Sequence, residues 1–231
     1  MDLGLSGKGA LVMASSGGIG RGVAFELAKE GAKVMLFARS EQKLKQTSDA
    51  IAQETGNRPN FIVGDMTSIK DVEEAVEETV SRYGGLWALF NNTGGPPAGG
   101  FDHFDDAAWQ SAFELSTLSY VRAIRASLEP MREAGGGRIV NNTSASTKEA
   151  IDSLILSNVF RSGLVGLGKS LARELGSEKI LINTVGPGRI DTDRVAHLDQ
   201  LWADQAGISL DEQRDRSQSS IPLGAYGLPT D

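Results

Sequence analysis

Cysteine is absent from the 231 residues, which excludes disulfide bonds, thiol catalysis and metal sites built on thiolates. A basic excess is absent too: the net charge is −7 at pH 7, which argues against a nucleic-acid partner. No apolar run approaches membrane-spanning length, and the start of the chain lacks the basic and apolar regions of a signal peptide. His, Asp and Glu residues show no metal-ligand spacing. We therefore expect a cytoplasmic protein without a metal centre.

Low-complexity segments and internal repeats are also lacking, so nothing divides the chain. Its length and its 40% hydrophobic content suit one domain over residues 1–231. Apolar runs typical of strands alternate with helical patterns, which predicts an α/β fold with a parallel sheet and helices on both faces. The expected strands are 10–13, 33–38, 60–64, 86–90, 137–144 and 180–185, and the longest expected helices are about 41–55, 106–132 and 157–175.

The most informative stretch is the glycine-containing turn at residues 14–20, between the first apolar run and a helical pattern. A helix N-terminus carries unpaired N–H groups and the positive end of the helix dipole, and glycines let a pyrophosphate approach the backbone. A strand that turns through glycines into a helix is the context that a nucleotide site requires. A tight turn without a ligand is the alternative interpretation.

The second expected strand ends at Arg39 and Ser40, and no carboxylate follows until Glu41. In dinucleotide sites an acidic residue here binds the adenosine ribose, whereas an arginine accommodates a 2′-phosphate. The sequence therefore favours NADP(H) over NAD(H). The alternative is that Arg39 is an ordinary surface charge at the end of a strand.

Polar and glycine residues follow every expected strand, at the edge where open α/β sheets bind ligands. They are residues 14–20, Arg39 with Ser40, Asp65, residues 92–95, Ser144, and Pro187 with Gly188.

Together these residues resemble the short-chain dehydrogenase/reductase family, most closely its 3-oxoacyl-carrier-protein-reductase-like members. The resemblance covers nearly the whole chain and includes residues 91–94, 137–144 and 169–174 as well as Asn183. It implies a Rossmann-type doubly wound sheet with strand order 3-2-1-4-5-6. The family continues past residue 227 into a seventh strand, which we expect to be missing here, either because the chain is truncated or because its tail is not included.

The resemblance also implies roles for individual residues. Cofactor contacts are expected from Ala14, Ser15, Ser16, Gly18 and Ile19 at the pyrophosphate, Asp65 and Met66 at the adenine, Asn92, Thr93 and Gly94 at the adenosine ribose, and Pro187, Gly188, Ile190 and Thr192 at the nicotinamide. A substrate lid is expected at about 189–220, where Trp202 with its apolar neighbours could equally pack as the core of a small helix.

Departures from the family pattern fall in the expected active site. Ala14 replaces a glycine of the turn, and Ser116 falls where the family has a helix asparagine. The family's Tyr-x-x-x-Lys pair falls on Ser157 and Arg161. The three tyrosines of the chain lie elsewhere, at Tyr83, Tyr120 and Tyr226.

Two functions are compatible with this pattern. The favoured one is an NADP(H)-dependent oxidoreductase for a small-molecule carbonyl or secondary alcohol, with Ser144 donating a hydrogen bond to the carbonyl and Ser157 and Arg161 as the altered pair. Arg161 can stabilise an oxyanion but cannot relay a proton, so water is the expected proton source. The alternative is a catalytically impaired NADP(H)-binding protein with a regulatory or partner-subunit role. The two long helices resemble those that pair across family subunits, so a homodimer or homotetramer is expected.

Overall fold

The computed structural model describes residues 2–231 and contains one parallel six-stranded sheet. Its strands are β1 (Gly9–Met13), β2 (Lys33–Ala38), β3 (Asn60–Val63), β4 (Ala88–Asn91), β5 (Gly137–Asn142) and β6 (Ile180–Val185). They are ordered β3-β2-β1-β4-β5-β6, which confirms the expected topology. The register sets Leu11 of β1 between Met35 of β2 and Leu89 of β4.

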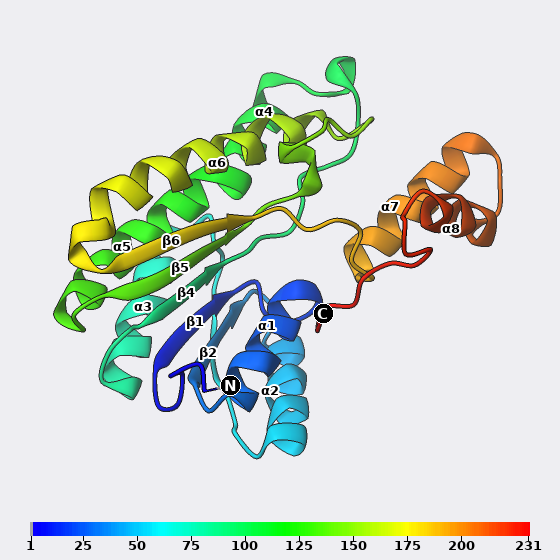
Figure 1. The fold of residues 1–231 in the computed structure, drawn as a ribbon. Helices are drawn as coiled ribbons and strands as arrows, with labels where there is room; N and C mark the ends of the chain where they lie inside the picture. The colour runs from blue at the N-terminus through cyan, green and yellow to red at the C-terminus, as the bar shows by residue number, and fades with distance from the viewer. Residues whose placement is uncertain (1) are drawn as a thin grey trace.

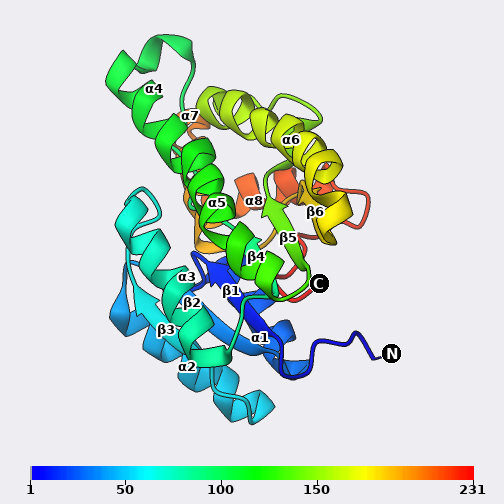
Figure 2. The same cartoon turned by 90° about the vertical axis from the view of Figure 1, so that its left-hand side faces the viewer.

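Helices cover both faces of this sheet (Figures 1 and 2). They are α1 (Gly18–Lys29), α2 (Glu41–Thr55), α3 (Ile69–Tyr83), α4 (Asp106–Phe113), α5 (Ser119–Glu133), α6 (Ile155–Leu175), α7 (Asp193–Ala206) and α8 (Leu210–Ser219). Helices α7 and α8 stand beyond the carboxyl ends of the strands, apart from the two layers (Figure 1). In residues 2–231 no helix is both long and apolar enough to span a membrane.

The core follows from the alternation of side chains along the strands. Leu11 and Met13 point to the face covered by α3, α5 and α6, where they join a cluster that includes Ile124. Val12 and Leu36 point to the opposite face and pack with residues of α1 and α2. Both faces are therefore buried, and the carboxyl edge of the sheet is left as the place for a site.

The expected helix at 106–132 is helical but not regular. Between α4 and α5 lies a π-helical turn, η2 (Glu114–Leu118), of the kind often found at functional sites. The hydroxyl of Thr117 in this turn donates to the Phe160 carbonyl of α6 at 3.0 Å. The turn therefore fixes α6 relative to α5. In the same turn, the buried Oγ of Ser116 has no hydrogen-bond partner among residues 2–231.

Ala14 ends β1 in an unusual backbone conformation, with φ of +47°. Non-glycine residues pay about 1–2 kcal/mol for left-handed backbone. The conformation sets the Ala14 carbonyl to accept a hydrogen bond from Asn92 Nδ2 at 3.3 Å, which links the ends of β1 and β4.

We predict that Ala14→Gly raises the free energy of unfolding by about 1 kcal/mol, because the relief of left-handed strain exceeds the extra entropy that glycine gives the unfolded chain. Urea denaturation of the purified variant measures this change. Ala24→Gly is the matched control: Ala24 is a buried residue inside α1, and its replacement should lower stability by at least about 1 kcal/mol. An Ala14→Gly protein no more stable than the parent would contradict the assignment of strain.

Candidate active site

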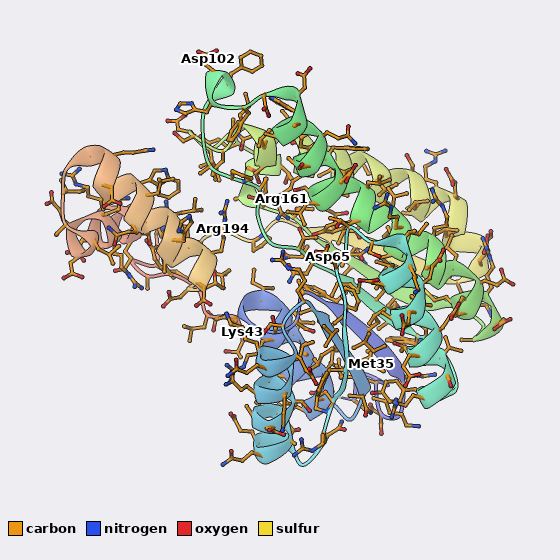
Figure 3. All side chains as sticks on the ribbon, turned by 180° about the vertical axis from the view of Figure 1, so that it is seen from behind. Met35, Lys43, Asp65, Asp102, Arg161 and Arg194 are labelled. Atoms are coloured by element: carbon orange, nitrogen blue, oxygen red, sulfur yellow. The ribbon has the colours of Figure 1, made fainter. Side chains whose placement is uncertain are left out.

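A cleft of about 750 Å³ opens where the carboxyl ends of the strands face α7. Its floor consists of the residues that follow β1, β4, β5 and β6, and its roof comes from α7 and the segment after α8. Figure 3 shows Lys43, Arg161 and Arg194 along this side of the molecule.

Most residues expected to contact a cofactor line this cleft. They are Ala14, Ser16, Gly18, Ile19, Asn92, Thr93, Gly94, Pro187, Gly188, Ile190 and Thr192. Residues as distant in the sequence as Ala14 and Thr192 thus lie at one edge of the sheet. They meet there because parallel strands all end at the same edge.

Five of the expected cofactor residues lie outside the lining. Ser15 is fully buried, and its N–H and Oγ are both bonded to the backbone of Phe37, at 3.1 and 3.0 Å. Arg39 is exposed at the end of β2, and Ser40 caps α2. Asp65 accepts hydrogen bonds from the N–H and hydroxyl of Thr67, and Met66 belongs to the core.

The start of α1 has the features of an anion site. Gly17 provides no side-chain cap, so the first N–H groups of the helix are available to a ligand. Gly18 has φ of +52°, and a Cβ there would lie 3.3 Å from Thr192 Cγ2. A Cβ on Gly20 would lie only 2.5 Å from the Ala14 carbonyl oxygen. Glycine is therefore needed at both positions to keep the turn open toward the cleft.

Lys43 is a cleft residue that the sequence interpretation missed. It lies in the first turn of α2, and its backbone N–H donates to the N-cap hydroxyl of Ser40. The signal was present in the sequence: a basic residue three positions after a helix cap lies near the positive end of that helix. Together with Arg39 it gives this corner two exposed cations.

Arg161 is buried in the wall of the cleft and is only 6% exposed as a residue. It donates to the carbonyls of Gly94 and Thr143 at 3.2 Å and of Asn142 at 3.4 Å. No carboxylate of residues 2–231 lies within ion-pair distance of it. Arg161 therefore fixes the loop after β4 against the end of β5 and has no carboxylate partner among these residues.

Ser144 and Ser157 line the same cleft as Arg161. Ser157 is 7% exposed and lies one helical turn before Arg161 on α6, so both project from one face of the helix. Ser144 accepts a hydrogen bond from the Ser146 N–H at 3.1 Å, which leaves its hydroxyl proton free to donate. The arrangement offers hydroxyl donors and a fixed cation.

Tyr120 lies beneath this wall and was also missed. Its hydroxyl donates to the Asn142 carbonyl at 2.5 Å, the same acceptor that Arg161 uses. Burial raises the pKa of the phenol above its ordinary value, although the charge of Arg161 acts in the opposite direction. Tyr120 is fully buried and does not line the cleft, so it supports Arg161 and remains protonated.

Arg194 is the third residue that the sequence interpretation missed. It lies in the first turn of α7 and lines the cleft, and its Nη2 donates to the Pro96 carbonyl at 2.7 Å. The guanidinium covers Gly95, where a Cβ would meet Arg194 Nε at 2.7 Å. Burial and the charge of Arg161 lower the pKa of Arg194.

A buried ion pair holds the roof in place. Arg189 Nη1 donates to Asp199 Oδ1 at 2.7 Å, and Tyr226 Oη donates to Asp199 Oδ2 at 2.9 Å. Asp199 is fully buried, and the Arg189 guanidinium lies 4.7 Å from the centre of the Trp202 ring. The segment before α7, the middle of α7 and the segment after α8 are thereby joined. Within residues 2–231 no group of three or more His, Asp or Glu side chains is arranged for a metal ion.

Comparisons with known proteins agree with this geometry. The family model for short chain dehydrogenases matches residues 8–201. The 3-oxoacyl-(acyl-carrier-protein) reductase FabG of Aquifex aeolicus is 29% identical over 229 residues, covering 99% of this chain and 88% of that protein. A tryptophan variant of actinorhodin polyketide ketoreductase, solved with NADPH, has a TM-score of 0.92 and 31% identity over 100% of this chain and 88% of its own. L-sorbose reductase of Gluconobacter frateurii, solved with NADPH and L-sorbose, has a TM-score of 0.93 and 29% identity with the same coverage.

These matches and the strand order identify a Rossmann-type oxidoreductase fold. The chain belongs to the short-chain dehydrogenase family, as its sequence motifs predicted.

Proposed function

We propose that this protein is an NADP(H)-dependent oxidoreductase that interconverts a carbonyl and a secondary alcohol, like the reductases it resembles. The observation that carries the proposal is the cleft itself: an uncapped helix N-terminus and a wall of Ser144, Ser157 and Arg161 line the same space. The first suits a dinucleotide, and the second suits a polarised oxygen.

The residues present fit the cofactor. The turn at Gly17 and Gly18 leaves its N–H groups open to a pyrophosphate. A Cβ at Gly94 or Gly188 would meet no atom within 4 Å, so both border open space on the cleft. Arg39, Ser40 and Lys43 supply two cations and a hydroxyl for a 2′-phosphate, and both structural neighbours described above were solved with NADPH.

When bound, NADPH supplies the hydride. Ser144 donates a hydrogen bond to the substrate oxygen, and the fixed charge of Arg161 stabilises the negative charge that develops there. Neither serine nor arginine has a pKa near neutrality, so a water molecule in the cleft provides the proton. Ser157 keeps its proton and holds that water or the substrate oxygen. Segment 189–220 closes the substrate end with the apolar side chains of Leu198 and Trp202.

We predict that Arg161→Ala lowers kcat/KM by about 10- to 100-fold and also weakens NADPH binding, because a hydrogen bond to a charged group contributes about 1.5–3 kcal/mol. Ser157→Ala should cost less than about tenfold, because water can take the place of its hydroxyl. The measurement is NADPH oxidation with a panel of ketones, aldehydes and acyl thioesters, alongside NADPH titration.

Arg161→Lys is the control, since it retains the charge. A thermal melt of each variant shows whether the loss of the three Arg161 hydrogen bonds destabilises the fold; the Asn142 and Gly94 carbonyls keep a donor each, from Tyr120 and Thr93. If the parent binds NADPH tightly and oxidises it with none of the substrates, the cofactor-binding alternative replaces the enzyme. Unchanged affinity and turnover in Arg161→Ala would remove Arg161 from the site.

The cofactor preference depends on Arg39 and Lys43. We predict that the parent binds NADPH at least about tenfold more tightly than NADH and that Arg39→Asp reverses this preference, since a charge-assisted phosphate contact contributes about 1.5–3 kcal/mol. Lys43→Glu should reduce NADPH affinity, whereas Lys45→Glu, an exposed residue of the same helix outside the cleft, should not. Equal affinity of the parent for both cofactors would contradict the assignment.

We also propose that α5 and α6 pair across subunits of a homodimer or homotetramer. Both helices lie on one face of the sheet, and Val159 of α6 is 49% exposed. Light scattering at micromolar protein concentration should give a mass of at least two chains. A monomer under these conditions would argue against the pairing.

A further inference from the structure

Two arginines in the cleft have no counter-charge. Arg161 donates only to backbone carbonyls, and the one hydrogen bond of the Arg194 guanidinium among residues 2–231 is that from Nη2 to the Pro96 carbonyl. The remaining N–H groups of Arg194 have no protein partner in that range. A guanidinium carries five N–H donors in a planar fork that matches a carboxylate or phosphate.

The position of Arg194 is electrostatically unfavourable in the protein alone. It lies in the first turn of α7, where the helix dipole is positive and disfavours a cation. Arg161 adds a like charge nearby, and burial removes part of the solvation. These effects act together, so an anion bound at Arg194 would remove several unfavourable contributions at once.

Arg189 provides the contrast inside the same cleft. It also lines the wall, but it is neutralised by the buried carboxylate of Asp199 at 2.7 Å. The lining carboxylates of Glu149 and Asp193 are exposed and form no ion pair with Arg161 or Arg194. A protein of net charge −7 therefore leaves two cations unneutralised at the substrate end of its cleft.

We infer that the substrate carries a carboxylate or phosphate group, which Arg194 binds through its free N–H groups in the field of Arg161. The inference rests on the proposed function and names the class of substrate. The apolar side chains of Val195 and Leu198, on the same helix, line the cleft beside Arg194 and suit the carbon chain between the anion and the carbonyl.

The pyrophosphate of the cofactor is the competing partner for Arg194. Its proposed place is the start of α1, where Thr192 lies against Gly18. Arg194 instead contacts Gly95 and Pro96, beyond the Gly94 carbonyl that Arg161 binds. This separation favours the substrate, and the experiment distinguishes the two.

The test compares matched anionic and neutral probes on the NADPH-loaded protein: 4-oxopentanoate with its methyl ester, and dihydroxyacetone phosphate with dihydroxyacetone. The variants are Arg194→Met, which keeps an unbranched stem without charge, and Arg194→Lys, which restores charge. Arg173→Met removes an exposed arginine of α6 outside the cleft and is the control. The readouts are kcat/KM, NADPH affinity, and calorimetric binding of each probe to the NADP⁺-loaded protein, which needs no turnover.

We expect the parent to prefer the anionic member of at least one pair by about tenfold or more, and Arg194→Met to reduce that ratio about tenfold, with partial recovery in Arg194→Lys and no change in Arg173→Met. Anion binding that depends on Arg194 without turnover would support the inference and overturn the proposed function. If the protein turns over or binds the probes but prefers neither anionic probe to its neutral counterpart, the inference is overturned and the proposed function stands. A loss of NADPH affinity in Arg194→Met that matches its loss of turnover would assign Arg194 to the pyrophosphate and also overturn the inference.

Discussion

The buried guanidinium of Arg161 is the interaction on which the site depends. It connects the end of β5 to the loop after β4 and holds both against α6. A charge of this kind is costly to bury unless every donor is directed at an acceptor, so it constrains the backbone around it. A guanidinium acts in proteins as a fixed cation with planar donors. The family's lysine can lose a proton, whereas this group can only attract and orient.

A chain of side-chain amides extends the same constraint across the sheet. Asn142 Nδ2 donates to Asn92 Oδ1 at 2.8 Å, and Asn92 Nδ2 donates to the Ala14 carbonyl. The ends of β5, β4 and β1 are therefore joined, from the wall of the cleft at Arg161 to the turn before α1. Ala14, with its left-handed backbone, is the last acceptor in this series of hydrogen bonds. Its strained conformation therefore helps to hold the floor of the cleft together.

The strands could be predicted from the sequence because each is a continuous apolar run next to a turn, whereas their order came from the family resemblance. The limits expected for β2 and β6 agree with the structure. Residues that follow the strands were found for the same reason, since parallel strands end at a common edge. Ser15 shows the limit of that argument: position in the turn indicated a ligand contact, but alternation turned its side chain toward Phe37.

Tyr120 and Arg194 were missed because their roles depend on distant neighbours, whereas the local signal for Lys43, its place in the first turn of α2, was overlooked. Tyr120 lies under Arg161 only through the packing of α5 against β5, and periodicity marks it as an ordinary core residue. Arg194 matters through a carbonyl 98 positions away in the chain. The π-helical turn around Ser116 lies between α4 and α5, and no residue pattern in the sequence indicated it.

The closure of the roof on itself has an evolutionary consequence. Arg189, Asp199 and Tyr226 join the segments before α7 and after α8 to the middle of α7, while residues 226–231 rest on α1 through the contact of Pro229 with Gly22. Substitutions on the inner face of α7 can therefore reshape that wall of the cleft while the strands stay unchanged. Gene duplicates of such a protein can diverge in what they accept by changes within one short segment.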